Sequence, residues 1–357
     1  MAIEQAVGIR YTAPMQATAT ETKRGILLLN LGSPDSTEVP DVRRYLHQFL
    51  MDKYVIDVPW LLRKFIVCGT ILPKRPAESA EAYASIWWDE GSPLKVFTER
   101  LAEGVRGEMQ VPLEVAMRYQ NPSIEVGLRA LVEKHGVNEV VLVPLYPHYA
   151  MSSTLTSVVE TQKVLSRVAP GVKLHVMPSF YKDPLYIDAL VESSKESLGD
   201  YDHLLISFHG LPERHLHKTD PTGSHCLSRP DCCEVESLAH ETCYRHQCYE
   251  TAKAYLSAAG IPEGKWSIAF QSRLGRDPWL LPATDAEVVR LAKEGVKRMA
   301  VICPAFVADC LETLEEIGMR AKEDFQAAGG EDLWLVPCMN THPAWVKALS
   351  GLIAKVP

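Results

Sequence analysis

Short apolar segments separated by helical patterns run along most of this chain. Eight of them are rich in Val, Leu and Ile and alternate little between apolar and polar positions, as is typical of strands covered on both faces. They span residues 25–32, 112–119, 139–147, 173–180, 203–210, 266–273, 298–306 and 332–339. Helical patterns lie between most of them, for example at 123–135, 184–198, 285–294 and 309–326. This alternation predicts parallel sheets joined by right-handed crossovers.

The predicted strands divide into two groups of four, and a weakly repeated sequence pattern supports the division. Gly136 leads through an apolar strand to Pro144, and Gly295 leads in the same way to Pro304. A length of 357 residues also suggests about two domains. We therefore expect an α/β fold of two similar lobes, each with a four-stranded parallel sheet flanked by helices.

The expected organisation has four parts along the chain. A flexible N-terminal arm covers residues 1–22, an N-terminal lobe 23–182, a C-terminal lobe 183–340 and a C-terminal helix 341–357. The arm is polar and lacks the apolar core of a signal peptide, and no segment reaches the roughly 18 uncharged apolar residues of a membrane span. The net charge of −8 argues against nucleic-acid binding. We expect a cytoplasmic protein.

The segment 57–75 departs from the strand and helix alternation. It holds many apolar residues, among them Trp60 and Phe65, with Arg and Lys interspersed. Such a segment can lie in a membrane interface or line the entrance of an apolar ligand. A core helix between two strands accounts for the pattern equally well.

His209 stands at the carboxyl end of a predicted core strand, in the run Ser207-Phe208-His209-Gly210-Leu211-Pro212. Ligands bind at this end of the strands in open α/β sheets. Histidine also gains and loses a proton near neutral pH. This position therefore favours a functional imidazole, and the plain alternative is a histidine that only hydrogen-bonds the turn.

A pair of glutamates follows another predicted strand end. Asp309 is a candidate N-cap, and Glu312 could complete a capping box with it, which is the structural alternative for Glu312. Glu312 and Glu316 are four residues apart, so one helix face carries both. Together with His209 they could hold a divalent metal or relay protons. Motifs for nucleotide chemistry, such as a P-loop or G-x-G-x-x-G, are missing from the sequence.

These motifs resemble those of ferrochelatases. Residues 207–212 resemble the active-site histidine motif of that family, and residues 306–316 resemble its acidic helix. Further matches, in family order, are Leu29-Asn30-Leu31-Gly32-Ser33-Pro34, Gly91-Ser92-Pro93-Leu94, Met117-Arg118-Tyr119, Leu145-Tyr146-Pro147, Phe270-Gln271-Ser272-Arg273 and Asp277-Pro278-Trp279-Leu280. The resemblance covers nearly all of 25–355. It implies a lyase of haem biosynthesis that inserts Fe²⁺ into protoporphyrin IX, with two Rossmann-like lobes and the active site in the cleft between them.

The resemblance also implies roles for the acidic and basic residues. His209 would accept the pyrrole protons as general base. Glu312 and Glu316 would carry protons or metal along their shared face, aided by Asp309. The substrate Fe²⁺ would meet His209 and Glu312.

Four more residues are expected to bind the macrocycle. Arg118 and Tyr119 would lie on the opposite wall of the cleft. Trp279 could pack in the cleft, although a structural tryptophan is an equal alternative. Leu31 stands where members that act on coproporphyrin typically carry Tyr, which favours protoporphyrin IX. Position 310 is Cys, where some members have a second His.

Five of the nine cysteines crowd into residues 226–248, within an insertion expected at 213–248. In a reducing cytosol, clustered thiols favour metal over disulfides. The C-x5-C-C-x9-C-x4-C pattern lacks the paired spacing of ordinary zinc sites. Some microbial ferrochelatases carry a [2Fe–2S] cluster in an internal segment after the histidine motif, and this segment resembles it.

The expected cluster ligands are Cys226, Cys232, Cys233 and Cys243. Cys248 is left out because its surroundings align with members that lack a cluster. Zinc, free thiols and disulfides stay open as alternatives. The neighbouring histidines that could substitute as ligands are His225, His240 and His246.

The remaining expectations concern partners and rival functions. The segment 57–75 resembles the lip that guards the cleft and touches membrane in some ferrochelatases, so peripheral contact with the inner face of the cell membrane is expected. Family members occur as monomers and homodimers. Rival functions are a chelatase that loads cobalt or nickel into another tetrapyrrole, a non-catalytic haem or porphyrin carrier, and an iron–sulfur redox sensor on the same scaffold.

Overall fold

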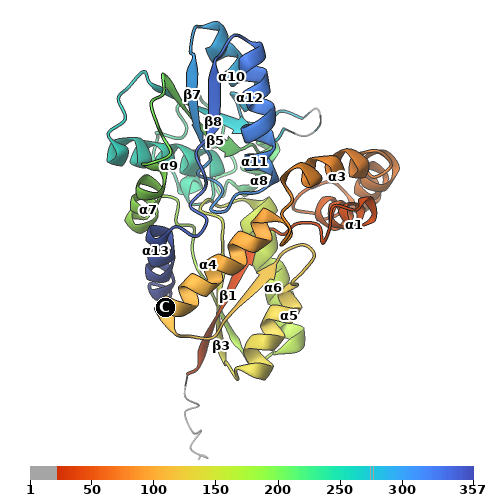
Figure 1. Ribbon diagram of the computed structural model, residues 1–357. Coiled ribbons are helices and arrows are strands. Elements are labelled where there is room, and N and C mark those ends of the chain that lie inside the picture. The colour runs from red at the N-terminus through yellow and green to blue at the C-terminus, as the bar shows by residue number, and fades with distance from the viewer. Residues whose placement is uncertain (1–21, 274, 276) are drawn as a thin grey trace, which may run out of the picture.

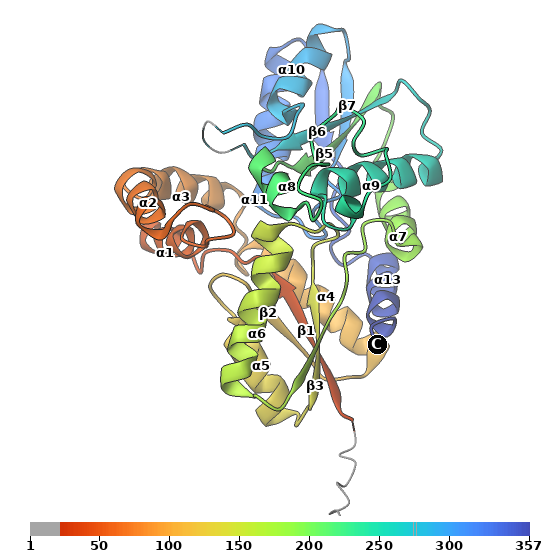
Figure 2. The ribbon, with the colours of Figure 1, turned by 180° about the vertical axis from the view of Figure 1, so that it is seen from behind.

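Two four-stranded parallel sheets form the frame of the molecule, one above the other in Figure 1. The structure, a computed structural model, describes residues 22–273, 275 and 277–357, so the expected arm at 1–22 lies almost wholly outside the described residues. Helices flank both sheets (Figures 1 and 2). The predicted α/β architecture of two similar lobes is confirmed.

Each predicted strand overlaps an observed one. The first sheet has the order β2 (Leu113–Met117), β1 (Arg24–Asn30), β3 (Glu139–Pro144) and β4 (Lys173–Val176). The second has the order β6 (Trp266–Gln271), β5 (His203–His209), β7 (Arg298–Ile302) and β8 (Asp332–Leu335). Most predictions run two to four residues past the carboxyl end. The apolar pattern continues there because loop residues such as Leu145, Met177 and Val336 are still buried.

Helices fill the connections between strands in the described part of the chain. The α-helices are α1 (Val39–Leu50), α2 (Trp60–Lys64), α3 (Arg75–Ile86), α4 (Pro93–Met109), α5 (Ile124–Arg129), α6 (Thr156–Val168), α7 (Pro184–Ser194), α8 (Glu213–Thr219), α9 (Tyr244–Ala259), α10 (Thr284–Lys293), α11 (Leu311–Leu314), α12 (Lys322–Ala327) and α13 (Pro343–Ala354). Segments of π-helix cover Phe65–Ile71, Ala130–Lys134, Met151–Leu155 and Glu316–Ala321, and a 3₁₀ turn covers Leu238–Glu241.

One apolar core is shared by the two sheets. Successive residues of a strand face opposite sides of its sheet. Ile26 and Leu28 of β1 therefore enter the same buried cluster as Phe208 of β5, which we call the shared core. Leu27 and Leu29 point the other way, into a separate cluster with residues of α5 and α6. The two lobes are thus joined by hydrophobic burial as well as by the chain.

The C-terminal helix α13 belongs to this shared core. It contacts α4 beside the first sheet and α7 beside the second, which settles a placement that the sequence left open (Figures 1 and 2). Its fully buried Trp345 packs against the rings of Phe180 and Tyr186, with centroids 5.9 and 6.2 Å away. The Tyr186 hydroxyl donates to the Pro304 carbonyl at 2.7 Å. The stretch between β4 and α7, where the lobes were expected to join, lies beside this contact.

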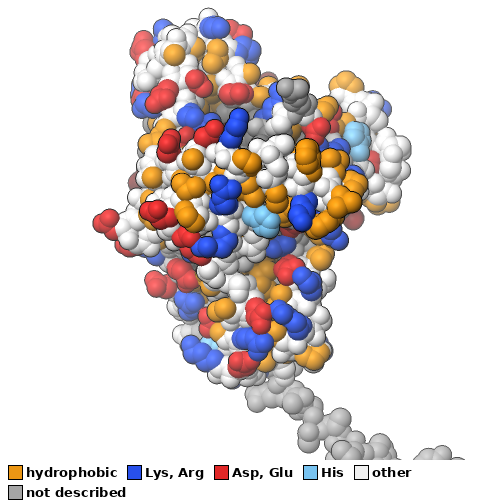
Figure 3. Space-filling view, turned by 90° about the vertical axis from the view of Figure 1, so that its right-hand side faces the viewer, with side chains coloured by type: hydrophobic (Ala, Val, Ile, Leu, Met, Phe, Trp, Pro, Cys, Tyr) orange, Lys and Arg blue, Asp and Glu red, His pale blue; other side chains and the backbone are white. Residues whose placement is uncertain are grey.

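The apolar segment 57–75 is not a core helix, so that interpretation is wrong. It forms α2 and the π-helix Phe65–Ile71 and projects from the first sheet (Figure 1). Leu61 is 74% exposed and Phe65 68%, while Val67 is buried and holds the segment down. Orange and blue side chains gather on this face in Figure 3. In the described part of the chain, no helix is both long and apolar enough to cross a bilayer.

A carboxylate ties the base of this segment to the second lobe. The side chain of Asp57 is 4% exposed and accepts from Arg214 Nε of α8 at 2.6 Å. Lys218 of α8 also donates to Asp57. Burial raises the pKa of Asp57, but these two donors outweigh it and lower the pKa to about 2. The projecting segment is therefore anchored across the cleft by an ionised group.

Candidate active site

A cavity of about 680 Å³ opens between the ends of the two sheets. Its volume lies within the roughly 300–1,000 Å³ of small-molecule sites. Leu31 after β1, His209 at the end of β5, Ser272 after β6, and Glu312 and Glu316 after β7 all line it. The carboxyl ends of parallel strands from both lobes therefore converge on one space, as the family resemblance implied.

His209 is held in one tautomer by its own turn. Its Nδ1 lies 2.6 Å from the carbonyl oxygen of Gly210. Because a carbonyl only accepts, Nδ1 carries the hydrogen and Nε2 keeps its lone pair in the neutral ring. Gly210 is required here, since a Cβ would stand 2.7 Å from the Gln271 carbonyl oxygen. The site thus has an imidazole whose basic nitrogen is Nε2.

The acidic segment begins differently from the sequence expectation. Cys310, and not Asp309, is the N-cap of α11, and the reciprocal bonds are made with Thr313. Asp309 is 4% exposed, and its carboxylate accepts from Thr313 Oγ1 at 3.0 Å and from Asn340 Nδ2 at 2.7 Å. The capping-box interpretation of Glu312 is therefore wrong, and its carboxylate stays with the cavity. Asp309 braces the loop and is not among the lining residues of the described chain.

The predicted single helix over 309–326 is also wrong in detail. The chain passes from α11 into the π-helix Glu316–Ala321 and then into α12. A π-turn takes one more residue per turn than an α-helix and is often found at functional sites. Glu312 and Glu316 nevertheless both line the cavity. Their common face survives because the change of helix type begins at Glu316 itself.

Glu316 is the more restrained of the two glutamates. Its Oε1 accepts from the backbone N–H of Ser272 at 2.7 Å, and its Oε2 accepts from the Ser272 hydroxyl at 2.6 Å. Burial raises the pKa of Glu316 above its ordinary value, while the Ser272 donors and His209 oppose that rise. A carboxyl with a raised pKa exchanges its proton closer to neutral pH.

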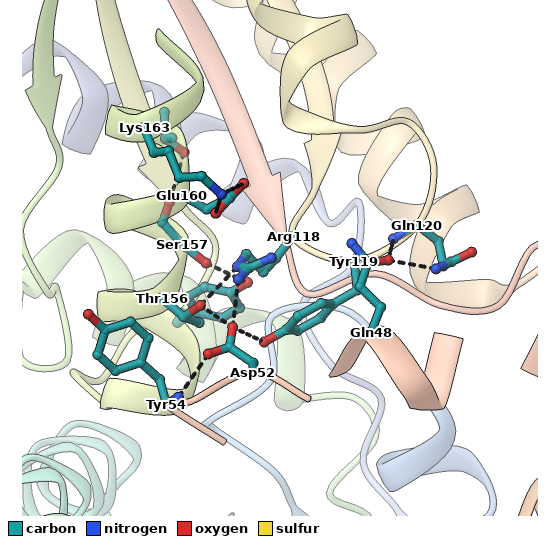
Figure 4. Close-up of polar contacts among 12 residues, drawn as sticks. Gln48, Asp52, Tyr54, Arg118, Tyr119, Gln120, Thr156, Ser157, Glu160 and Lys163 are labelled. Atoms are coloured by element: carbon teal, nitrogen blue, oxygen red, sulfur yellow. Dashed lines mark hydrogen bonds and ion pairs between the residues drawn. The ribbon is translucent and has the colours of Figure 1, made fainter. Parts of the chain in front are cut away.

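Arg118 and Tyr119 lie behind the cavity wall. Arg118 Nη2 and the Tyr119 hydroxyl both donate to Asp52 Oδ2, at 2.5 and 3.0 Å (Figure 4). Thr156 adds a third donor at 2.5 Å, and the Asp52 side chain is only 5% exposed. Tyr119 packs edge-on against Phe49, which does line the cavity. Within the described residues, neither Arg118 nor Tyr119 is part of the lining.

Trp279 likewise supports the site from behind. It pairs with Pro212 in an isolated bridge, and its ring lies against the place where a side chain on Gly210 would sit. Its Nε1 is buried without a partner in the described residues. The structure thus gathers Leu31, His209, Glu312 and Glu316 in the lining, and sets Asp309, Arg118, Tyr119 and Trp279 around it.

Cations at the cavity were missed by the sequence reasoning. Lys74, Arg75, Arg273 and Arg320 all line it. Lys74 and Arg75 end the apolar segment, and Arg273 is the last residue of a predicted strand, so position at an element end was the available signal. Positive charge beside an apolar cavity suits a ligand that carries carboxylates.

The four expected cluster ligands do lie together. Cys226, Cys232, Cys233 and Cys243 are all buried. Hydrogen bonds from the thiols of Cys226 and Cys233 lower the pKa of Cys243 to about 3. Cys232 Sγ accepts from the backbone N–H of Leu227 at 3.4 Å.

The other candidate ligands of this segment have different partners. Cys248 is fully buried in the shared core, beside Tyr244. His225 Nε2 lies 2.6 Å from the Cys232 carbonyl oxygen, and His246 Nδ1 lies 2.8 Å from that of Cys233. Among the described residues, no group of three or more His, Cys, Asp or Glu is arranged so that it could hold a metal ion as it stands.

Comparison with known proteins decides the family. The ferrochelatase family model matches residues 23–356. The chain belongs to the ferrochelatase family. A ferrochelatase of Pseudomonas fluorescens is 55% identical over 339 residues, covering 94% of this chain and 99% of that protein. A ferrochelatase of Azotobacter vinelandii is 55% identical over 336 residues, covering 93% and 98%.

A solved structure supports the fold of this ferrochelatase. It is SirB from Bacillus subtilis with Fe³⁺, which aligns with a TM-score of 0.52 at 16% identity and covers 94% of this chain and 95% of SirB. At that identity the likeness concerns the two-lobe fold alone.

Removing the charge of Asp52 should destabilise this ferrochelatase. Asp52→Asn leaves the Arg118 guanidinium, whose side chain is 12% exposed, without its carboxylate. We expect a loss of about 3 kcal/mol in the free energy of unfolding, measured by urea titration. Asp35→Asn is the control, because its ion pair with Lys95 is more exposed and should cost less than about 1 kcal/mol. Equal losses in the two variants would contradict the larger stabilising contribution assigned to the buried Asp52.

Proposed function

We propose that this protein inserts Fe²⁺ into protoporphyrin IX to form protohaem, with His209, Glu312 and Glu316 handling the metal and the two released protons. One observation carries the proposal. An imidazole whose basic nitrogen is Nε2 shares the wall of one 680 Å³ cavity with two carboxylates. The chain also belongs to the ferrochelatase family over residues 23–356.

The chemistry requires a base and an acidic path. A free porphyrin holds two N–H groups at its centre, and these protons must leave as the metal enters. His209 Nε2 can accept a pyrrole proton because Nδ1 is already committed to the Gly210 carbonyl. The raised pKa of Glu316 suits it to take up that proton and release it toward solvent. Glu312 and His209 would contact the substrate Fe²⁺ before insertion.

The lining also fits the rest of the macrocycle. Leu31 and aromatic rings such as Phe49 offer apolar surface to the vinyl side of protoporphyrin IX. Arg75 and Arg273 offer cations to its two propionates. Arg118, Tyr119 and Trp279 would act through the residues they support. A carrier without turnover would need this cavity but no oriented base facing two carboxylates, so the geometry favours the enzyme.

We further propose that Cys226, Cys232, Cys233 and Cys243 hold a [2Fe–2S] cluster. Four buried thiols, two of which hydrogen-bond Cys243, with a backbone N–H aimed at the sulfur of Cys232, have the donor chemistry that such clusters require. The cluster would supply a redox-active centre at the base of the insertion after His209. Binding would deprotonate the thiols and separate them, because ligation requires thiolates.

The projecting segment 57–75 is proposed to rest on the cytoplasmic face of the membrane. Exposed Trp60, Leu61 and Phe65 would enter the interface, with Lys64 and Lys74 near the anionic headgroups. Because this segment flanks the cavity, an apolar product could leave directly into the bilayer surface.

Iron insertion is tested by anaerobic incubation with Fe²⁺ and protoporphyrin IX. The visible spectrum should change to that of haem. His209→Ala should lower the rate by about 100-fold or more, since it removes the base, while quenching of protein fluorescence by the porphyrin persists. His135→Ala is the control, because His135 pairs with Glu114 outside the cavity lining. Absence of haem with the wild-type protein would refute the function.

The cluster is tested by a matched pair of cysteine variants. Cys243→Ser should abolish bound iron and visible absorption of the anaerobically purified protein, because the thiols of Cys226 and Cys233 both hydrogen-bond Cys243. Cys248→Ser should keep both. Metal analysis and absorption spectra give the readout, and full iron content in Cys243→Ser would overturn the ligand set.

Membrane contact is tested by sedimentation with phosphatidylglycerol vesicles. Replacing both Trp60 and Phe65 by Ser should weaken vesicle binding by at least about tenfold, because two aromatic anchors are lost. Leu238→Ser is the control, since Leu238 is 71% exposed but lies in the cysteine-rich insertion. Equal binding of both variants would argue against the proposed surface.

A further inference from the structure

Gln271, at the end of β6, hydrogen-bonds both the turn that carries His209 and the acidic segment that carries Glu312. The Gln271 backbone carbonyl accepts from the Gly210 N–H at 2.7 Å, and its side-chain oxygen accepts from Ser207 at 2.7 Å. Its Nε2 donates to the Glu312 carbonyl at 2.7 Å. The turn of His209 and the start of the acidic segment are therefore fastened to one buried residue.

Ser272, the next residue, is strained. Its φ is +67°, a left-handed value that residues other than glycine adopt rarely and at a cost. In this conformation its N–H and its hydroxyl both point at the Glu316 carboxylate, at 2.7 and 2.6 Å. Glycine would adopt the backbone more easily but could supply only the N–H. The hydroxyl is thus what serine adds at this position.

The two carboxylates of the site are held unequally. Both oxygens of Glu316 are engaged by Ser272. The carboxylate of Glu312 meets the thiol of Cys310, which is a weak donor. One carboxylate is therefore fixed to a strand end, while the other can turn within the cavity.

We propose that Ser272 is a positioning residue that clamps Glu316 in one orientation, so that Glu316 is a stationary proton acceptor and Glu312 is the carboxylate that moves to meet Fe²⁺. This division of roles rests on the proposed iron insertion. It assigns Ser272 a task beyond closing the turn after β6.

The charges around Glu316 agree with this assignment. His209 faces it from the end of β5, Glu312 from α11, Arg320 from the next turn of the π-helix, and the Cys303 thiol from the end of β7. Burial raises the pKa of Glu316, and the two Ser272 bonds lower it. Removing the hydroxyl should therefore raise that pKa further.

The first test is steady-state insertion by Ser272→Ala and Ser272→Gly. Both lack the hydroxyl, so we expect kcat to fall about tenfold in each, with the KM for porphyrin unchanged. The acidic limb of the kcat–pH profile should move up by about one unit, because Glu316 must then be deprotonated at higher pH. Ser350→Ala, on α13 and outside the cavity lining, should leave both unchanged.

Comparing the two variants distinguishes the effect of losing the Ser272 hydroxyl from the effect of relaxing its left-handed backbone. Glycine relaxes the left-handed conformation, so Ser272→Gly should unfold at the higher temperature of the two while losing the same activity. If Ser272→Gly keeps wild-type kcat, or if both variants keep kcat and the acidic limb, the clamp is refuted.

The second test does not depend on turnover. Infrared difference titration against Glu316→Gln protein isolates the carboxyl stretch of Glu316. In Ser272→Ala its midpoint should rise by about one pH unit, and an unchanged midpoint overturns the inference. Failure of the wild-type protein to form haem would refute the proposed function instead, and the infrared result would still decide the role of Ser272.

Discussion

The shared core is the constraint on which the rest of this structure depends. Alternate residues of β1 and β5 meet in one apolar cluster, and α13 closes it by packing on both lobes. Two separately folded lobes would leave a cleft of variable width. Because apolar interiors are densely packed and resist deformation, the strand ends of the two sheets keep fixed positions relative to each other. The distances among the functional side chains follow from that rigidity.

On this frame the polar groups are arranged by short bonds from strand ends. Gln271 joins the His209 turn to the acidic segment, and Asp52 joins Arg118 and Tyr119 to the first helix. Buried polar groups of this kind are costly when unpaired, so each network specifies one arrangement of its members.

Much of this could be predicted from the sequence, for a physical reason. Strands covered on both faces need continuous apolar runs, and residues at their carboxyl ends must meet at the sheet edge, so His209 and Glu312 were found, while Leu31 was named from the family resemblance. Long-range partners were not readable. Arg118 is held by Asp52 and is not part of the cavity lining formed by the described residues. Because Asp52 lies 66 residues earlier in sequence, this partner could not be predicted. The π-helix at Glu316 and the left-handed Ser272 leave the hydrophobic pattern unchanged, and Cys310 is an unusual cap.

The bond between the His209 ring and the Gly210 carbonyl has one more consequence. Nδ1 is engaged by the Gly210 carbonyl, so only Nε2 of the ring can exchange a proton. Hydrogen ions must arrive and depart through the same atom, and they cannot be passed across the ring into the interior of the lobe. Each proton that Nε2 takes up must therefore leave again from Nε2, on the cavity side, before the next can be accepted.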